Sequence, residues 1–220
     1  MIGIMKIINK QLSGKVEVNK SIFISNIYYV DAIDDVNIKI SNIKKQYYDA
    51  KHNCFAYIIG KKMIKQFDDG EPNGTAGLPI LNVLKNNNLI NCIAIVTRYF
   101  GGVLLGASGL YKAYSDAVIT AIQNGNLLDV NCGNIYNLDI DYKLYNIIKN
   151  MTIDYEDIHI YKQSFYERVK LTILVKDTAI NSFLSSLKVF NNSYIIENIK
   201  EKVYYVIDNK KINFIKIEGI

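Results

Sequence analysis

The chain contains no tryptophan, only two histidines and two prolines, and three cysteines among its 220 residues. The cysteines, Cys54, Cys92 and Cys132, are odd in number and stand 38 and 40 residues apart. That spacing fits neither a disulfide framework nor the paired C-x-x-C ligands of a zinc site, so we expect buried apolar thiols. With two histidines and no G-x-S-x-G or H-E-x-x-H sequence, standard hydrolase and zinc sites have little support.

Long hydrophobic runs are also absent. The longest, at residues 93–96 and 101–107, are far shorter than the roughly 18–20 residues that a membrane-spanning helix needs. The first residues include no apolar run followed by a small-residue cleavage site, as a signal peptide would. We therefore expect a cytoplasmic protein with no membrane partner.

The composition is that of a folded protein, since 50% of the residues are hydrophobic and 21% are charged. The length exceeds the ~100–150 residues of one typical domain and favours two. Residues 1–130 carry 14 basic and 10 acidic side chains, a net charge of +4, and residues 131–220 carry 12 and 11, a net charge of +1. This excess permits a polyanionic partner, and it equally describes a surface solvated by lysines.

Hydrophobic periodicity predicts one α+β domain over residues 1–130. Alternating apolar residues indicate strands, and apolar spacings of three and four indicate helices. Pro79 suits the first turn of a helix, and Gly60-Lys61-Lys62 suits a hairpin turn. The predicted strands are 16–18, 22–30, 54–59, 63–67 and 93–97, and the predicted helices are 31–48, 79–85 and 110–123.

The pattern restarts near residue 134 and predicts a second domain over residues 131–220. Its order is βαββαβ, the ferredoxin-like arrangement, with residues 203–207 extending or pairing with the last strand. The boundary is expected near residues 125–134. The predicted strands are 135–140, 156–161, 165–175 and 194–199, and the predicted helices are 143–151 and 177–189.

A first candidate site is the loop of residues 68–77, with three carboxylates in four positions and three glycines. Glycines allow positive φ or close approach to a partner, and neighbouring carboxylates can coordinate a hard cation. The loop does not match an EF-hand, and a solvated acidic turn is an equally good interpretation. Its candidate binding residues are Asp68, Asp69, Gly70, Glu71, Gly74, Thr75 and Gly77.

A second candidate site is the glycine-rich stretch of residues 97–112, which follows a predicted strand and opens a predicted helix. In that context a helix N-terminus presents free amides to an anion. The spacing G-G-x-x-x-G-x-x-G is neither the Rossmann nor the Walker pattern, and close packing explains the glycines equally well. The candidate binding residues are Arg98, Tyr99, Gly101, Gly102, Gly106, Gly109 and Lys112.

His52 and Cys54 stand two residues apart, so both side chains lie on one face of an extended strand. A nucleophilic pair of this kind is conceivable, but no third group is placed beside it by the sequence. Cys54 is surrounded by apolar residues, which favours a buried core cysteine. We expect no catalytic residues, no resident metal and no cofactor.

The sequences HNCFAYIIG, DDGEPNGTAG-x-P and VTRYFGGVLLGASGL follow one another between residues 52 and 110. Together they resemble the bacterial YigZ branch of the YigZ/IMPACT family, and the resemblance covers essentially the whole chain. It implies a first domain similar in fold to the second domain of a small-subunit ribosomal protein and to the fourth domain of elongation factor G. The second domain would then be ferredoxin-like, as is that factor's fifth domain.

Departures from the family pattern are few. Asn73 stands where serine is usual, Ser108 where glycine is common, and Lys112 where the helix commonly carries arginine. Lysine keeps the positive charge but lacks the bidentate fork of arginine. The eukaryotic IMPACT relatives act in translational control with an extra N-terminal domain that these residues do not include, so that partnership does not transfer whole.

Three functional hypotheses follow. The first is a non-catalytic, translation-associated regulator that binds RNA, the ribosome or a translation factor. The second is an enzyme or small-molecule binder in which Asp68, Asp69 and Glu71, with or without a divalent metal, face the glycine-rich anion-binding loop. The third is a protein-interaction module with Tyr99 and Phe100 as aromatic anchors.

Arg98 discriminates among these hypotheses. If the two loops converge, Arg98 pairs with one of the three acids or points into a shared cleft. We expect Arg98 to be partly buried against the acidic loop and Lys112 to be more exposed.

Overall fold

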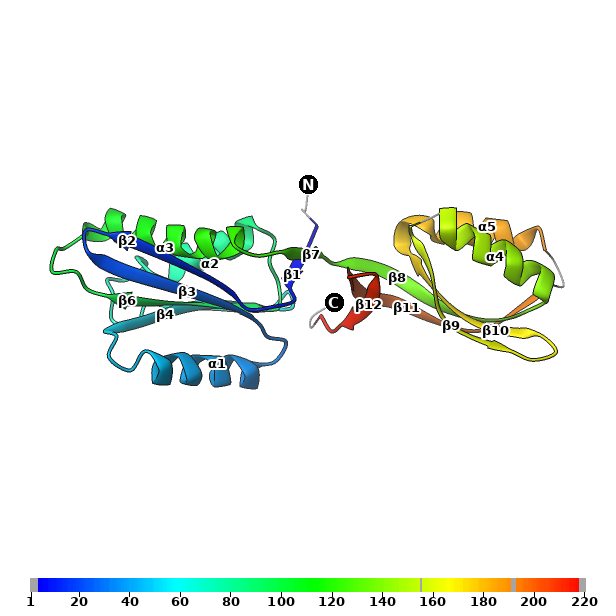
Figure 1. Cartoon of the computed structure of the whole chain (residues 1–220), viewed down its shortest axis with the longest axis horizontal. Coiled ribbons are helices and arrows are strands. Elements are labelled where there is room, and N and C mark those ends of the chain that lie inside the picture. Colours follow the sequence, from blue (N-terminus) through cyan, green and yellow to red (C-terminus); the bar gives the residue numbers. More distant parts are fainter. Residues whose placement is uncertain (1–3, 155, 191–192, 218–220) are drawn as a thin grey trace. The chain divides into compact units, whose positions relative to one another are not determined.

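The computed structural model describes residues 4–154, 156–190 and 193–217. They form two compact units. The first contains the described residues up to Val130 together with Lys216 and Ile217, and the second contains Asn131–Ile215. Each unit has its own sheet and its own helices (Figure 1).

The first unit is built on a five-stranded antiparallel sheet in the order β2-β3-β6-β4-β5. Helix α1 covers one face, and helices α2 and α3 cover the other (Figure 1). β6 has the near-continuous apolar sequence of a central strand buried on both faces. The elements are β2 (Leu12–Val18), β3 (Ser21–Tyr29), α1 (Ile33–Gln46), β4 (His52–Ile59), β5 (Met63–Phe67), α2 (Gly77–Asn86), β6 (Cys92–Tyr99) and α3 (Gly106–Gln123).

Two short strands of the first unit were not predicted. β1 (Lys6–Ile8) pairs antiparallel with β7 (Leu127–Asp129), which joins the first described residues to those after α3. A strand of three residues is too short for apolar alternation to be recognised. The starts of α2 and α3 also differ from expectation, since α2 begins two residues and α3 four residues earlier than predicted.

The second unit has the ferredoxin-like fold that the sequence predicts. Without β12, its sheet order β11-β8-β10-β9 places the four strands as fourth, first, third and second, all antiparallel. Helices α4 and α5 pack on one face over a common core. The elements are β8 (Asn131–Ile140), α4 (Tyr142–Asp154), β9 (Ile158–Phe165), β10 (Val169–Lys176), a 3-10 turn (Asp177–Ala179), α5 (Ile180–Lys188), β11 (Tyr194–Asp208) and β12 (Lys211–Ile215).

β11 is one strand of 15 residues, so residues 203–207 extend the last strand, which is one of the two alternatives that the sequence leaves open. Its pairing with β8 shifts register between Ile196 and Asn198 and between Lys200 and Val203. These irregularities interrupt the apolar alternation, which explains why the sequence divides the strand in two. β12, which forms a hairpin with the end of β11, was not predicted.

Candidate functional site

The acidic loop and the glycine-rich loop of the first unit meet. Arg98, near the end of β6, donates a hydrogen bond from Nη1 to Glu71 Oε1 at 2.6 Å. Arg98 is 5% exposed and Glu71 8% exposed, so the ion pair is buried. The expected pairing of Arg98 with the acidic loop is confirmed, but Arg98 is more deeply buried than predicted because it lies on the central strand beneath α3.

Glu71 also accepts a hydrogen bond from the fully buried Tyr114 of α3, whose hydroxyl lies 2.8 Å from Glu71 Oε1. Burial strongly raises the pKa of Tyr114, so its hydroxyl keeps the proton that it donates. The guanidinium of Arg98 lies 5.4 Å from the ring centroid of Phe23 and 5.6 Å from that of Phe100. Two aromatic rings and one carboxylate therefore fix the position of the arginine side chain.

Asp68 organises the N-terminus of α2. Its Oδ1 accepts hydrogen bonds from the amides of Ala76 at 3.0 Å and Gly77 at 2.7 Å, and its Oδ2 accepts one from Gly74 at 3.0 Å. Ala76, which directly precedes the helix, has no side-chain acceptor of its own. Asp68 therefore serves as the cap of α2 from nine residues away.

Asp69 is bound to the protein as well. Its Oδ2 accepts a hydrogen bond from the amide of Asn53 at 2.7 Å, and Lys44 Nζ lies 3.7 Å from its Oδ1. The three acids are thus neither a simple solvated turn nor a metal cluster. Among the described residues, no group of three or more histidine, cysteine, aspartate or glutamate side chains is placed to hold a metal ion.

Most glycines of the two loops have one of two structural roles. A Cβ at Gly101 would lie 2.1 Å from the backbone carbon of Lys20, and one at Gly77 would lie 2.7 Å from the backbone nitrogen of Phe67. Both glycines therefore permit close packing of backbones. A Cβ at Gly109 would meet only the Leu105 side chain, at 3.1 Å.

The other glycines permit a left-handed backbone. Gly102 and Gly106 have φ values of +84° and +70°, and added Cβ atoms there would meet open space. Gly70 and Gly74 have φ values of +85° and +75°. These four positions favour glycine because of conformation rather than packing. Thr75 donates from its hydroxyl to the carbonyl oxygen of Pro72, which closes the acidic loop.

Between the two loops lies a pocket of about 520 Å³. Its polar and charged lining residues are Lys51, His52, Glu71 and Arg98, and its larger apolar lining residues are Pro72, Phe100, Leu104, Leu105 and Leu110. Gly70, Gly106 and Ala107 complete the lining. Sequence reasoning missed Lys51 and the leucines, since a lone lysine beside a strand and apolar residues near a helix start carry no distinctive signal.

Of the fourteen predicted binding residues, only Gly70, Glu71, Arg98 and Gly106 line this pocket. Tyr99 alternates with Arg98 along β6 and therefore faces the α1 side, where its hydroxyl donates to Asp49 Oδ1 at 2.8 Å. That hydrogen bond is the main cause that raises the pKa of Tyr99 to about 12. Lys112 is exposed on α3, as expected.

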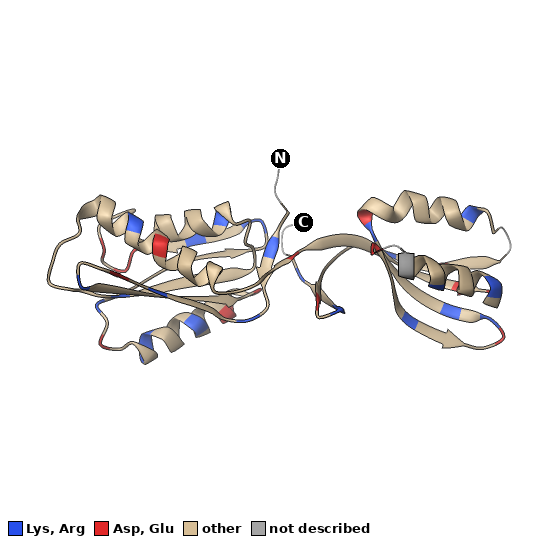
Figure 2. Ribbon diagram, turned by 45° about the horizontal axis from the view of Figure 1, so that its top comes forward, with Lys and Arg blue, Asp and Glu red and all other residues tan. Residues whose placement is uncertain are grey.

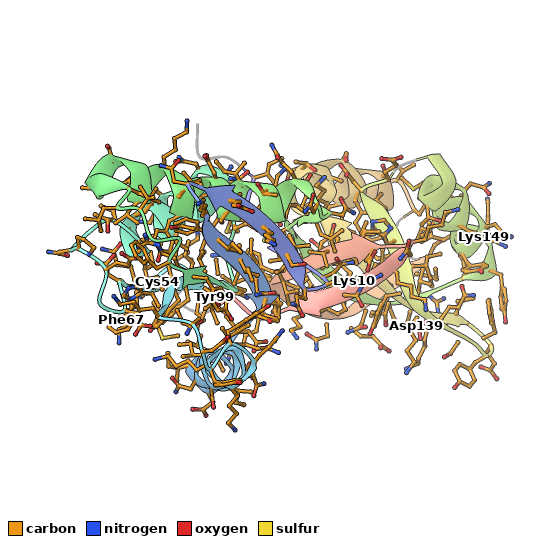
Figure 3. All side chains as sticks on the ribbon, turned by 60° about the vertical axis from the view of Figure 1, so that its left-hand side comes forward. Lys10, Cys54, Phe67, Tyr99, Asp139 and Lys149 are labelled. Carbon is orange, nitrogen blue, oxygen red and sulfur yellow. The ribbon has the colours of Figure 1, made fainter. Side chains whose placement is uncertain are left out.

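Cys54 is a fully buried core residue, as predicted (Figure 3). Its Sγ lies 2.9 Å from the carbonyl oxygen of Asp68 and 3.3 Å from the Tyr114 hydroxyl. The ring of His52 is turned toward the acidic loop, with Nδ1 2.7 Å from the carbonyl oxygen of Asp69. The two side chains therefore bind different atoms of the acidic loop and do not form a nucleophilic pair.

We predict that Cys54 and Cys92 resist alkylation by iodoacetamide in the folded protein at pH 8. Burial raises the pKa of both thiols, that of Cys92 to about 12, so the reactive thiolate is scarce as well as inaccessible. Mass spectrometry of the native protein should show label only at the half-buried Cys132, and all three should react after denaturation. Rapid native labelling of Cys54 would show that the site opens readily to solvent.

Comparisons with known proteins agree with this architecture. The family model described as the Impact N-terminal domain matches residues 19–122. The chain is 34% identical over 208 residues to the IMPACT family member YvyE of Bacillus subtilis. The alignment covers 92% of each chain. It is 32% identical over 178 residues to an IMPACT family member of Haemophilus influenzae, covering 78% of this chain and 84% of that one.

A solved structure shares the fold. The crystal structure of a hypothetical protein aligns over the full length of both chains with 24% identity and a TM-score of 0.57. Within the part of the chain that the structure describes, no helix has the length and apolar character needed to cross a bilayer. The identity of 34% to YvyE across 92% of both chains shows that this chain belongs to the IMPACT family.

Proposed function

We propose that this protein is a non-catalytic, translation-associated regulator that binds RNA, free or within the ribosome, at the end of the first unit where the two loops meet. The observation that carries the proposal is the glycine-rich loop. It ends at the N-terminus of α3 inside a pocket that also contains Lys51 and Arg98. A helix N-terminus beside two cations is suited to the phosphate groups of a nucleic acid.

The distribution of charge supports this proposal. Lys51 is exposed and lines the pocket, and the backbone of the exposed Lys20 lies beside Gly101 of the glycine-rich loop. Helix α1, which ends near Lys51, carries Lys44 and Lys45 in its last turn, and basic residues are visible along it in Figure 2. Membership of the IMPACT family, whose eukaryotic members act in translational control, points to the same process.

The surroundings of the acidic residues support a binding role rather than catalysis. The carboxylates of Asp68 and Glu71 accept hydrogen bonds from the protein itself, and the thiol of Cys54 is buried with a raised pKa. A general base or nucleophile has to reach a substrate in a suitable protonation state. We therefore assign these groups to the architecture of the site.

The test is the affinity of the full chain for single-stranded RNA, measured by fluorescence anisotropy between about 50 and 200 mM salt. We expect affinity to fall with salt, and Lys51→Ala to reduce the slope of log K against log salt by about 1. Lys85→Ala is the matched control, because this exposed lysine lies at the C-terminal end of α2, whereas the pocket adjoins the residues before that helix.

Absence of binding to both RNA and ribosomes at the lowest salt would refute the proposal.

A specific observation favours one other function. Phe100 is 48% exposed and Leu104 is 87% exposed, so the glycine-rich loop presents apolar side chains to solvent. These residues suit a protein partner. Capture of a protein partner that is lost on Leu104→Ser, together with no RNA binding, would replace the RNA proposal with a protein-interaction role.

A further inference from the structure

The pocket between the two loops is lined by polar side chains, and the fold does not use all of their hydrogen-bonding capacity. Its volume of about 520 Å³ lies within the roughly 300–1,000 Å³ typical of small-ligand sites. Its lining combines apolar side chains with a few polar and charged groups, as is usual in a site that orients a ligand.

We propose that this pocket binds a terminal phosphate group, a phosphomonoester, and that the attached base packs against Phe100 and Leu104. The inference rests on the proposed RNA-binding function and specifies which part of the nucleic acid enters the site. The same chemistry is present at the 5′ end of an RNA and in a free nucleoside monophosphate.

Arg98 supplies the first independent observation. A guanidinium has five N–H donors, and among the described residues only Nη1 of Arg98 has a protein acceptor, Glu71. Nε is buried with no hydrogen-bond partner, although Arg98 as a whole is 5% exposed and lines the pocket. Buried donors in folded proteins are normally paired, so an unpaired donor on a side chain that lines the pocket points to an acceptor brought by a ligand.

The N-terminus of α3 supplies the second independent observation. This helix has 18 residues, and Leu105, which precedes it, provides no side-chain cap. The positive φ of Gly102 and Gly106 turns the loop while leaving open space where a side chain would stand. The first amides of the helix, from Gly106 onward, therefore have no side-chain acceptor from the described residues and border the pocket.

Glu71 also borders the pocket, and its charge has to be included. Its Oε1 accepts hydrogen bonds from both Arg98 and Tyr114, so the carboxylate balances the arginine and holds its fork in place. The remaining attraction for an anion comes from Lys51 and the helix N-terminus, while Arg98 contributes oriented donors. A phosphomonoester offers three oxygens for these groups and up to two negative charges.

The apolar lining residues indicate that the phosphate carries a base. Phe100 and Leu104 are both substantially exposed and stand on the loop that leads into α3. An aromatic ring beside a phosphate site can stack on a nucleobase. A terminal phosphomonoester offers three free oxygens and up to two negative charges, whereas an internal phosphodiester offers two free oxygens and one charge.

The experiment measures binding of the full chain to two RNA oligonucleotides of one sequence, one with a 5′-phosphate and one with a 5′-hydroxyl, and to adenosine 5′-monophosphate and adenosine. We expect the phosphorylated RNA to bind at least about tenfold more tightly, since charge-assisted hydrogen bonds are added. Adenosine 5′-monophosphate should bind detectably and adenosine should not.

The decisive variant is Ala107→Asp, which places a carboxylate at the exposed start of α3 and leaves the Arg98–Glu71 pair untouched. It should remove the preference for the 5′-phosphate without loss of folding, because an acidic residue is favourable at a helix N-terminus. Asn86→Asp makes the same charge change at the far end of α2 and should retain the preference.

The possible outcomes distinguish failure of the phosphate pocket from failure of the proposed RNA-binding function. Equal affinity for the two RNAs, with no binding of adenosine 5′-monophosphate, overturns the phosphate pocket and leaves RNA binding in place. Binding of adenosine 5′-monophosphate without binding of either RNA supports the pocket, assigns it to free nucleotides and refutes the RNA function. Retention of the 5′-phosphate preference by Ala107→Asp contradicts the site.

Discussion

We expect Arg98→Ala to lower the free energy of unfolding of the first unit by about 3–5 kcal/mol, because it leaves the buried carboxylate of Glu71 without its charged partner. Lys112→Ala should change it by less than about 0.5 kcal/mol, since this lysine is exposed on α3. Hydrogen exchange of β6 and α3 in urea, in phosphate-free buffer, reports this unit alone. A larger loss for Lys112→Ala than for Arg98→Ala would reverse the roles assigned here.

A double-mutant cycle identifies the ion pair as the cause. Glu71→Gln keeps an acceptor for the Tyr114 hydroxyl but removes the charge, and Arg98→Met keeps much of the volume between the two aromatic rings. We expect the double variant to be clearly more stable than the sum of the single losses predicts. Additivity within about 0.3–0.5 kcal/mol would mean that the two side chains act independently.

Much of the fold is readable from the sequence because its elements have clean periodicity. The ferredoxin-like unit was predicted since its strands alternate and its helices keep an apolar stripe, as Leu144 and Ile148 do on α4. The start of α3 was placed four residues late. Gly106 and Gly109 lower the intrinsic helix propensity of the first turn, and the sequence offers no side-chain cap there.

The site was predicted as two loops, but not as a set of contacts. The sequence does not distinguish which of the three acids within four residues pairs with Arg98, and the fold of the loop after β5 selects Glu71. Tyr114 carried an unused signal: on α3 it shares the buried face of Leu110 and Ala117, where a hydroxyl needs a partner. Lys51 could not be found, because its position at the pocket depends on tertiary packing.

The role of Asp68 lies outside what local rules can detect. Capping rules inspect the residue just before a helix, and α2 is preceded by Ala76, which cannot cap it. The cap instead comes from the end of β5, across the turns that the glycines of the acidic loop permit. An acidic residue far from the helix start therefore appears in the sequence as a candidate ligand residue.

Asp68→Ala should accordingly lower the free energy of unfolding by about 2–3 kcal/mol, because a charged acceptor of three amides is lost. The stability of Asp68→Asn should lie between those of the wild type and Asp68→Ala, since the one side-chain oxygen of asparagine can still accept from the amides of Ala76 and Gly77. The matched control is Asp34→Ala, which removes an exposed aspartate from the first turn of α1 and should cost about 0.3–1 kcal/mol.

The same variants distinguish a cap from a ligand-binding acid. If Asp68 acts as a cap, Asp68→Ala accelerates hydrogen exchange at Gly74, Ala76 and Gly77 first, because these amides lose their acceptor. RNA affinity should then change only as far as folding is lost, and it should recover where the variant remains folded at low temperature. An unchanged exchange pattern with abolished binding would instead place the Asp68 carboxylate in direct contact with a ligand.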